Sequence, residues 1–157
     1  MKVVILSGIP GSGKSTVAKG YSKAKSFSAD HYFVSEDGVY RFDVTKLGEA
    51  HGECLRLFVE EVYNGTHDPF SDDRTLVVDN TNLSCCEIAP YVAIAQAYGL
   101  EIELVTVLCD PAIAAKRCVH GVPTHAVLAM ARRLEERQLP DHWKYNEKFS
   151  QRTVGNY

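Results

Sequence analysis

The sequence lacks a long apolar run and an excess of basic residues. Apolar residues make up 45% of the 157 positions, yet no stretch approaches the roughly 18 consecutive apolar residues that cross a bilayer. The chain has 17 Lys and Arg against 20 Asp and Glu, a net charge of -3, which excludes a strongly basic nucleic-acid footprint over the whole chain. We therefore expect a cytoplasmic protein with no membrane partner.

The sequence also lacks a cysteine framework. Its five cysteines are odd in number, and their spacing matches neither a zinc site nor a disulfide scaffold. His51 and Cys54 stand three residues apart, but no second pair accompanies them, so a packed helix face is the favoured interpretation over half a metal site. The sequence predicts free thiols in a reducing compartment.

Repeats and low-complexity segments are absent, and the length suits one domain. We expect residues 1–157 to form a single domain, in which the segment from Gly65 to Arg74 is a polar loop. Short apolar runs alternate with amphipathic segments, which predicts an α/β three-layer fold with a parallel sheet. The predicted strands are 3–6, 27–29, 76–78 and 102–108, and the predicted helices begin near Lys14, Thr45, Cys86, Pro111 and Thr124.

Charge is distributed unevenly along the chain. Residues 1–28 carry five lysines and no acid, residues 29–110 carry four basic and sixteen acidic side chains, and residues 111–157 carry eight basic and four acidic ones. Two interpretations stay open: ordinary solvated surface, or two basic ends that converge on phosphate.

A phosphate-binding loop follows the first predicted strand. The segment GIPGSGKS fits G-x-x-x-x-G-K-[ST] in full, between a strand and a helix, as this motif requires. Its glycines let backbone N–H groups wrap an anion, Lys14 reaches the β and γ oxygens, and Ser15 offers a hydroxyl to Mg²⁺. The predicted nucleotide-phosphate site is Gly8, Ile9, Pro10, Gly11, Ser12, Gly13, Lys14, Ser15 and Thr16.

Two further strands end in acidic residues at the expected ligand edge of the sheet. Asp30 follows the second strand, where it could accept the proton of an incoming hydroxyl or could cap the next turn. Asp79 ends the third strand and has the position of a Walker B carboxylate that holds Mg²⁺ directly or through water. Asn80 could face the acceptor, whereas a simple turn is the alternative for this polar run.

Residues 111–137 predict a lid of two short helices separated by a Gly/Pro break. Arg117, at the end of the first helix, is the candidate that stabilises charge on a transferred phosphate. Arg132, Arg133 and Arg137 either add to this field or solvate the outer face, and solvation is expected for Arg137. In the tail, Trp143, Tyr145 and Phe149 could stack on a base, but they more commonly pin a terminus to its domain.

Four segments together resemble the 5'-hydroxyl polynucleotide kinases of bacteriophages and their cellular relatives in the P-loop kinase group. They are GIPGSGKST, ADHYF, VVDNTN and KRCVHGVP, the last followed by Met130 and Arg133, and the resemblance runs from about Val3 to Arg137. It implies transfer of the γ-phosphate of ATP to the 5'-OH end of RNA or DNA. Asp30 then matches the general base, Lys14 and Ser15 the phosphate and magnesium groups, and Arg117 a lid arginine.

The sequence departs from that family at two places. Phe33 stands where the phage enzymes have an arginine bound to an acceptor phosphate, and a second lid arginine is replaced near His120. Arg41 is the candidate for the missing acceptor-side charge. We expect no phosphatase or ligase domain beside the kinase.

Three functions follow from these observations. The first is a stand-alone 5'-polynucleotide kinase in end repair that uses ATP, or another NTP, with Mg²⁺. The second is a kinase of a nucleoside or sugar, which the isoelectric point near 6.1 and the lack of a basic stripe favour. The third is a non-catalytic NTP-binding module.

Overall fold

The chain forms a parallel sheet in a computed structural model that describes residues 1–68, 73–118 and 121–155. Within these residues the sheet has five strands in the order β2-β3-β1-β4-β5, and all of its pairings are parallel. The strands are β1 (Lys2–Ser7), β2 (Lys25–Phe27), β3 (Thr75–Asp79), β4 (Glu101–Leu108) and β5 (Phe149–Gly155). The predicted α/β class is confirmed.

The central strand β1 is buried on both faces because its residues are apolar without alternation. Val3 and Ile5 belong to the larger core, whereas Val4 and Leu6 face the opposite side and belong to a second one. Four successive apolar residues therefore serve two different helical layers. This double burial places the end of β1, where the phosphate loop begins, in the middle of the sheet.

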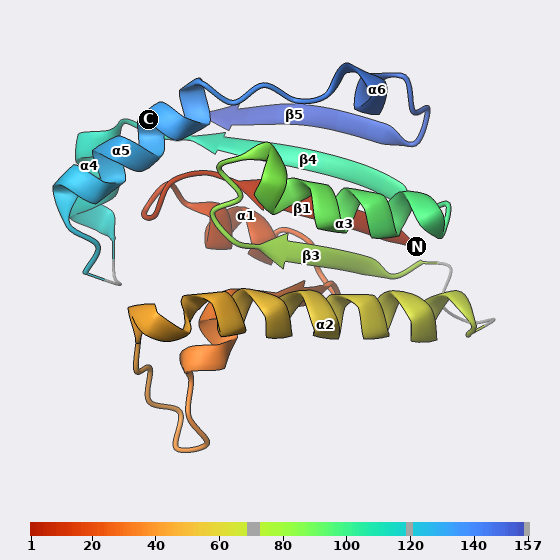
Figure 1. Cartoon of the computed structure of the whole chain (residues 1–157), viewed down its shortest axis with the longest axis horizontal. Coiled ribbons are helices and arrows are strands. Elements are labelled where there is room, and N and C mark those ends of the chain that lie inside the picture. Colours follow the sequence, from red (N-terminus) through yellow and green to blue (C-terminus); the bar gives the residue numbers. More distant parts are fainter. Residues whose placement is uncertain (69–72, 119–120, 156–157) are drawn as a thin grey trace.

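Helices cover both faces of the sheet (Figure 1), which confirms the predicted three layers. Helix α1 packs on one face, and α2 and α3 pack on the other. The helices are α1 (Lys14–Lys19), α2 (Leu47–Thr66), α3 (Cys85–Ala97), α4 (Pro111–Arg117), α5 (Thr124–Glu135) and α6 (Asp141–Lys144), with the 3-10 turns η1 (Ala29–Phe33) and η2 (Val44–Lys46).

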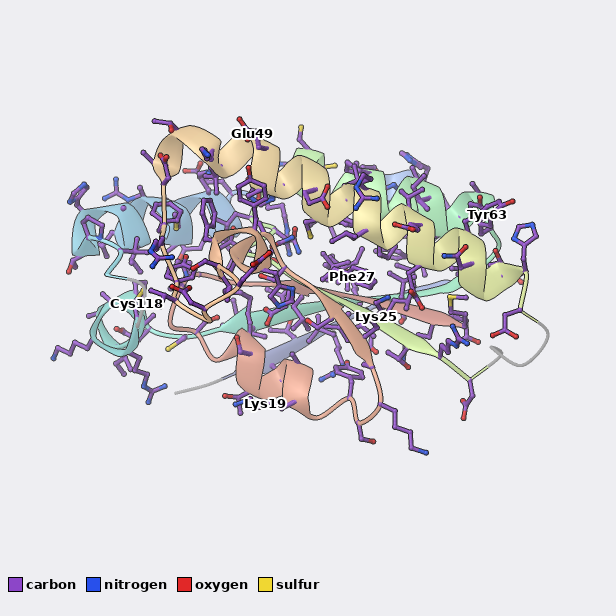
Figure 2. The ribbon with its side chains drawn as sticks, turned by 90° about the horizontal axis from the view of Figure 1, so that it is seen from below. Lys19, Lys25, Phe27, Glu49, Tyr63 and Cys118 are labelled. Carbon is purple, nitrogen blue, oxygen red and sulfur yellow. The ribbon has the colours of Figure 1, made fainter. Side chains whose placement is uncertain are left out.

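Helix α2 runs the length of the sheet, with Glu49 and Tyr63 near its two ends (Figure 2). Four of its five buried residues follow a four-residue spacing, which forms one apolar stripe toward the core; they are Ala50, Cys54, Phe58 and Val62, and the fifth is Gly65. The helix begins two residues later than predicted because Asp43 accepts the backbone N–H of Thr45 at 2.9 Å and caps η2 first.

The C-terminal strand β5 and the short helix α6 were not predicted from the sequence. The sequence of β5, FSQRTVG, is mostly polar, because the strand lies at the edge of the sheet and most of its side chains are exposed. Trp143 is buried and Phe149 packs against the main core, so the interpretation that these aromatics pin the tail is confirmed for both. Tyr145 is 83% exposed.

The five cysteines are free thiols, as predicted. His51 is exposed while Cys54 is buried, and the described residues contain no group of three His, Cys, Asp or Glu side chains that could hold a metal ion. Among the helices of the described residues, none has both the length and the apolar character needed to cross a membrane.

Phe58 is the residue on which the packing of α2 depends. It is fully buried, and its ring makes edge-to-face contacts with Phe27 at 5.6 Å and Tyr91 at 5.1 Å between centroids. We expect Phe58→Ala to lower the free energy of unfolding by about 3–5 kcal/mol. The matched control is Leu57→Ala, since Leu57 is 40% exposed and should cost no more than about 0.5 kcal/mol. Urea denaturation measures both, and equal losses would contradict the described packing.

Candidate active site

The phosphate loop spans residues 8–13 between β1 and α1. Gly11 and Gly13 have φ angles of 78° and 96°, which are accessible to glycine and strained for other residues. A Cβ atom on Gly11 would lie 2.0 Å from the carbonyl oxygen of Ala114 in α4. This loop therefore needs Gly11, at a position that the motif leaves open, for two reasons: its backbone conformation and the close contact with the first lid helix.

Hydrogen bonds join the loop to the segment after β3. The N–H of Gly8 donates to the carbonyl of Thr81 at 2.9 Å, and the side-chain amide of Asn82 donates to the carbonyl of Leu6 at 2.7 Å. The hydroxyl of Ser7 donates in turn to the carbonyl of Asn82 at 2.9 Å. Asn82 is 2% exposed, so this connection is buried and fixes the ends of β1 and β3 side by side.

Lys14 curls back over its own loop. Its ammonium donates to the carbonyls of Gly8 at 2.8 Å and Ile9 at 2.9 Å. Burial lowers the pKa of Lys14, and the nearby carboxylates of Asp79 and Asp30 oppose this shift. A desolvated ammonium of this kind is well suited to meet the negative oxygens of a phosphate.

Ser15 and Asp79 form the second part of the site. The hydroxyl of Ser15 donates to the carboxylate of Asp79 at 3.2 Å. Burial raises the pKa of Asp79, whereas Lys14 and Ser15 lower it. Two hard oxygen ligands beside a phosphate site fit Mg²⁺, which takes few protein ligands and completes its shell with phosphate oxygens and water. These residues therefore suit the predicted metal.

Asp30 lies in the first turn of η1, next to this pair. The cap of η1 is Ser28, whose hydroxyl accepts the N–H of Asp30 at 3.2 Å, so the turn does not need the Asp30 side chain as its cap. The Asp30 carboxylate is exposed, and its charge acts on both Lys14 and Asp79. The structure thus brings three predicted residues together: Asp30 from η1, Asp79 from the end of β3 and Lys14 from the start of α1.

Asn80 holds the start of η1 in place. Its side-chain oxygen accepts the buried N–H of Ala29 at 2.8 Å, and its amide nitrogen donates to the thiol of Cys54 at 3.5 Å. The hydroxyl of Tyr91 donates to the same sulfur at 3.4 Å. Asn80 is 7% exposed, so in this structure its amide supports the backbone beside Asp30.

Tyr40 is a contact of Asp30 that sequence reasoning missed. Its phenol donates to Oδ1 of Asp30 at 3.0 Å. Burial and the Asp30 carboxylate together raise the pKa of Tyr40 to about 12, so it stays a hydrogen-bond donor at neutral pH. No spacing rule links the two residues, because the intervening residues form an irregular turn.

Arg41 points into that same turn. Its guanidinium donates to Asp37 at 3.0 Å and to the hydroxyl of Ser35 at 2.5 Å. Phe33, at the position of the family's arginine, is 5% exposed and packs against Ala29 and Ala50. The charge of Arg41 is therefore already paired within residues 35–41.

The lid packs on the phosphate loop through Ile9. This side chain is 2% exposed and lies in a cluster with residues of α4, α5 and the segment before α3, namely Leu83, Ala114, Val127 and Ala131. Arg117 is the last residue of α4; it is exposed and makes no hydrogen bond or ion pair with the described residues. Its neighbour Cys118 (labelled in Figure 2) lies near enough to act on the pKa of Lys14 and Tyr40. His120 lies outside the described residues.

The expectation that Arg137 solvates an outer face is wrong. Its guanidinium donates to the hydroxyl of Ser7 at 2.5 Å, the carbonyl of Asn82 at 3.0 Å and the hydroxyl of Thr106 at 2.9 Å. Arg137 follows the last turn of α5 and turns back over the ends of β1 and β4, which the helical pattern of α5 does not reveal. Burial lowers its pKa, but a guanidinium remains charged.

The two arginines within α5 remain at the surface. Arg133 pairs with Glu87 at 2.9 Å, and Glu87 also accepts the backbone N–H groups of Leu83 and Ser84 at the start of α3. Arg132 is exposed, and its guanidinium has no hydrogen bond or ion pair within the described part of the chain. Arg133 therefore ties the lid to α3, while Arg132 has the solvated position expected of a surface arginine.

The parallel sheet, the phosphate loop and the Ser15–Asp79 pair define a nucleotide-binding protein of the P-loop class. Residues 3–137 match the family described as an AAA domain. This match covers most of the chain, which belongs to that family of P-loop proteins.

Relatives and solved structures agree with this placement. The chain is 33% identical over 136 residues to human NEDD4-binding protein 2; the match covers 82% of this chain and 7% of the human protein. The chain thus spans a small part of this relative's length.

Two solved structures share the fold. A chain of the Pnkp1/Rnl/Hen1 RNA repair complex aligns with a TM-score of 0.65 and 18% identity, over 85% of this chain and 44% of that one. A gluconokinase from Sinorhizobium meliloti 1021 aligns with a TM-score of 0.53 and 15% identity, over 99% of this chain and 84% of that one. At these identities the likeness shows the fold alone, which is that of P-loop kinase domains and confirms this part of the predicted resemblance.

Arg137→Leu tests the anchor at the strand ends. The change removes three hydrogen bonds and leaves buried acceptors without their donor, so we expect the free energy of unfolding to fall by about 1–3 kcal/mol. Arg132→Leu is the matched control on the same lid segment and should stay within about 0.5 kcal/mol. Thermal and urea unfolding of both variants give the comparison, and an unchanged Arg137→Leu protein would refute the anchoring role.

Proposed function

We propose that the chain is an ATP- and Mg²⁺-dependent kinase that transfers the γ-phosphate to the 5'-hydroxyl end of RNA or DNA in end repair. The observation that carries this proposal is the position of Asp30: an exposed carboxylate at the carboxyl edge of the sheet whose charge acts on both Lys14 and Asp79. A base in this place lies beside the phosphate that the loop would hold. The RNA repair complex that shares the fold supports the choice of acceptor.

Each residue of the site then has a role in one step. The Asp30 carboxylate accepts the proton of the 5'-OH, the freed oxygen bonds to the γ-phosphorus, and the bond from that phosphorus to the β-γ bridging oxygen breaks, so that ADP leaves with the electron pair. Lys14 and Arg117 stabilise negative charge on the transferred group. Ser15 and Asp79 would hold magnesium, whose charge neutralises the phosphate oxygens when it is bound.

A metabolite kinase is the second candidate. The acceptor side is acidic: besides Asp30, the segment from η1 to the first turn of α2 has four exposed carboxylates, namely Glu36, Asp37, Asp43 and Glu49. Such a surface repels a polyanionic strand more than it repels a neutral sugar or nucleoside. The gluconokinase that shares the fold is consistent with this alternative.

The test of transfer uses ATP labelled at the γ-phosphate, Mg²⁺ and single-stranded RNA and DNA oligomers with 5'-OH ends. We expect label on an oligomer with the wild-type chain and none with Lys14→Ala, which lacks the phosphate-binding ammonium. A panel of nucleosides and sugars runs in parallel. Label on a metabolite but on no oligomer would replace the proposal with the second candidate, and ATP binding without any transfer would favour a binding module.

Asp30→Asn tests the assigned base. The amide cannot accept the proton, so we expect kcat to fall by about 10²- to 10⁴-fold while ATP binding, measured by calorimetry, is retained. Asp43→Asn is the matched control, because the Asp43 carboxylate bonds to Thr45 and caps η2. Its kcat should stay within about twofold of the wild type. Wild-type turnover by Asp30→Asn would rule out this mechanism.

A further inference from the structure

The turn after η1 is a closed and internally bonded unit. Val34 and Tyr40 pair as an antiparallel bridge, the N–H of Arg41 donates to the carbonyl of Phe33 at 2.8 Å, and the N–H of Ser35 donates to the carbonyl of Val39 at 3.1 Å. Backbone hydrogen bonds between the two sides of the turn fix the backbone position of the residue at its end, and so the direction in which its side chain leaves. That residue is Tyr40.

Side chains inside the turn reinforce it. The carboxylate of Asp37 accepts the hydroxyl of Ser35 at 2.5 Å, the N–H of Val39 at 3.2 Å and the guanidinium of Arg41 at 3.0 Å. These bonds hold the pKa of Asp37 below its usual range, so the charged form that makes them persists at neutral pH. The turn is thus a small rigid support.

Phe33 connects this support to the core. Its ring lies 6.2 Å from the ring of Tyr40 at an interplanar angle of 73°, and 5.0 Å from that of Phe42. Phe33 is itself buried against Ala29 and Ala50. Phe33, which stands in place of the family's arginine, therefore packs against the ring of Tyr40 and connects it to the buried cluster.

We propose that Tyr40 is a positioning residue for Asp30, whose phenol holds one carboxylate oxygen so that the base keeps the orientation needed to receive the acceptor's proton. This inference rests on the proposed function. The terminal torsion of an aspartate is broad, so an exposed carboxylate samples many orientations unless a partner holds it. The 3.0 Å bond from Tyr40 to Oδ1 supplies such a partner from a support that is already rigid. Tyr40 acts through Asp30 and not on the phosphate.

The chain provides a matched control at Tyr32. The Tyr32 phenol donates to the carboxylate of Glu49 at 2.8 Å, and its ring also packs on Phe33, with centroids 5.4 Å apart. Tyr32→Phe and Tyr40→Phe each remove one phenol–carboxylate hydrogen bond and keep the ring. Only in Tyr40→Phe does the lost bond reach Asp30.

The experiment follows phosphate transfer to an oligomer with a 5'-OH end and measures both kcat and KM. We expect Tyr40→Phe to lower kcat by about 10- to 100-fold with the KM for ATP unchanged, and Tyr32→Phe to change neither by more than about twofold. In an Asp30→Ala background, Tyr40→Phe should have no further effect, because the group it positions is gone. Equal kcat for wild type and Tyr40→Phe, or additive losses in the double variant, would overturn the inference.

A second readout separates this inference from the proposed function. If the wild type transfers no phosphate to the oligomer, the proposed function fails, and the contact itself is tested by titrating the tyrosine phenols by NMR. The Tyr40 phenol should ionise near pH 12 in the wild type and at lower pH in Asp30→Asn, where the neighbouring charge is absent. An unshifted Tyr40 titration would refute the contact, and the inference with it.

Discussion

The hydrogen bonds that tie the end of β1 to the segment after β3 are the constraint on which the site depends. Asn82 bonds to the last residues of β1 through its amide and its carbonyl, and Arg137 reaches the same carbonyl from the lid. All of these groups are buried or half-buried, where a satisfied polar network holds one geometry firmly. The phosphate loop, the Asp79 carboxylate and the lid therefore share a single anchor, and a shift in one would move the others.

That anchor keeps two opposite charges where burial disfavours both. Burial lowers the pKa of Lys14 and raises that of Asp79, because the charged form of each side chain is less favourable here than in water. Their mutual attraction offsets part of this cost. A phosphate beside Lys14 and a divalent cation beside Asp79 would offset the rest, because each bound charge is opposite to the one it meets. A metal–nucleotide pair would thus complete the electrostatics of the site.

The sequence predicted the donor side more fully than the acceptor side. The phosphate loop and β3 follow local rules, namely glycine spacing and an apolar run that ends in an acid, so they can be read from neighbouring residues. The contacts of Asp30 and Arg137 join residues 10 to 130 positions apart, and no local pattern encodes them. Strand β5 was missed for a related reason: an edge strand with polar side chains lacks the apolar run that marked the central strands.

This division between local and distant residues would also separate the two substrates of the proposed kinase. The donor phosphate would contact mainly the backbone of one loop, a design shared by many P-loop proteins, whereas the acceptor would meet side chains of residues 28–43. In this segment a buried aromatic residue, Phe33, stands where the resembled family has an arginine, and Arg41 is paired with Asp37. Acceptor recognition would then depend more on how Asp30 is held than on a fixed charge for an acceptor phosphate. Changes in this turn would alter the acceptor side while the phosphate loop stays intact, because the glycine conformations of the loop and its bond to Thr81 do not involve residues 28–43.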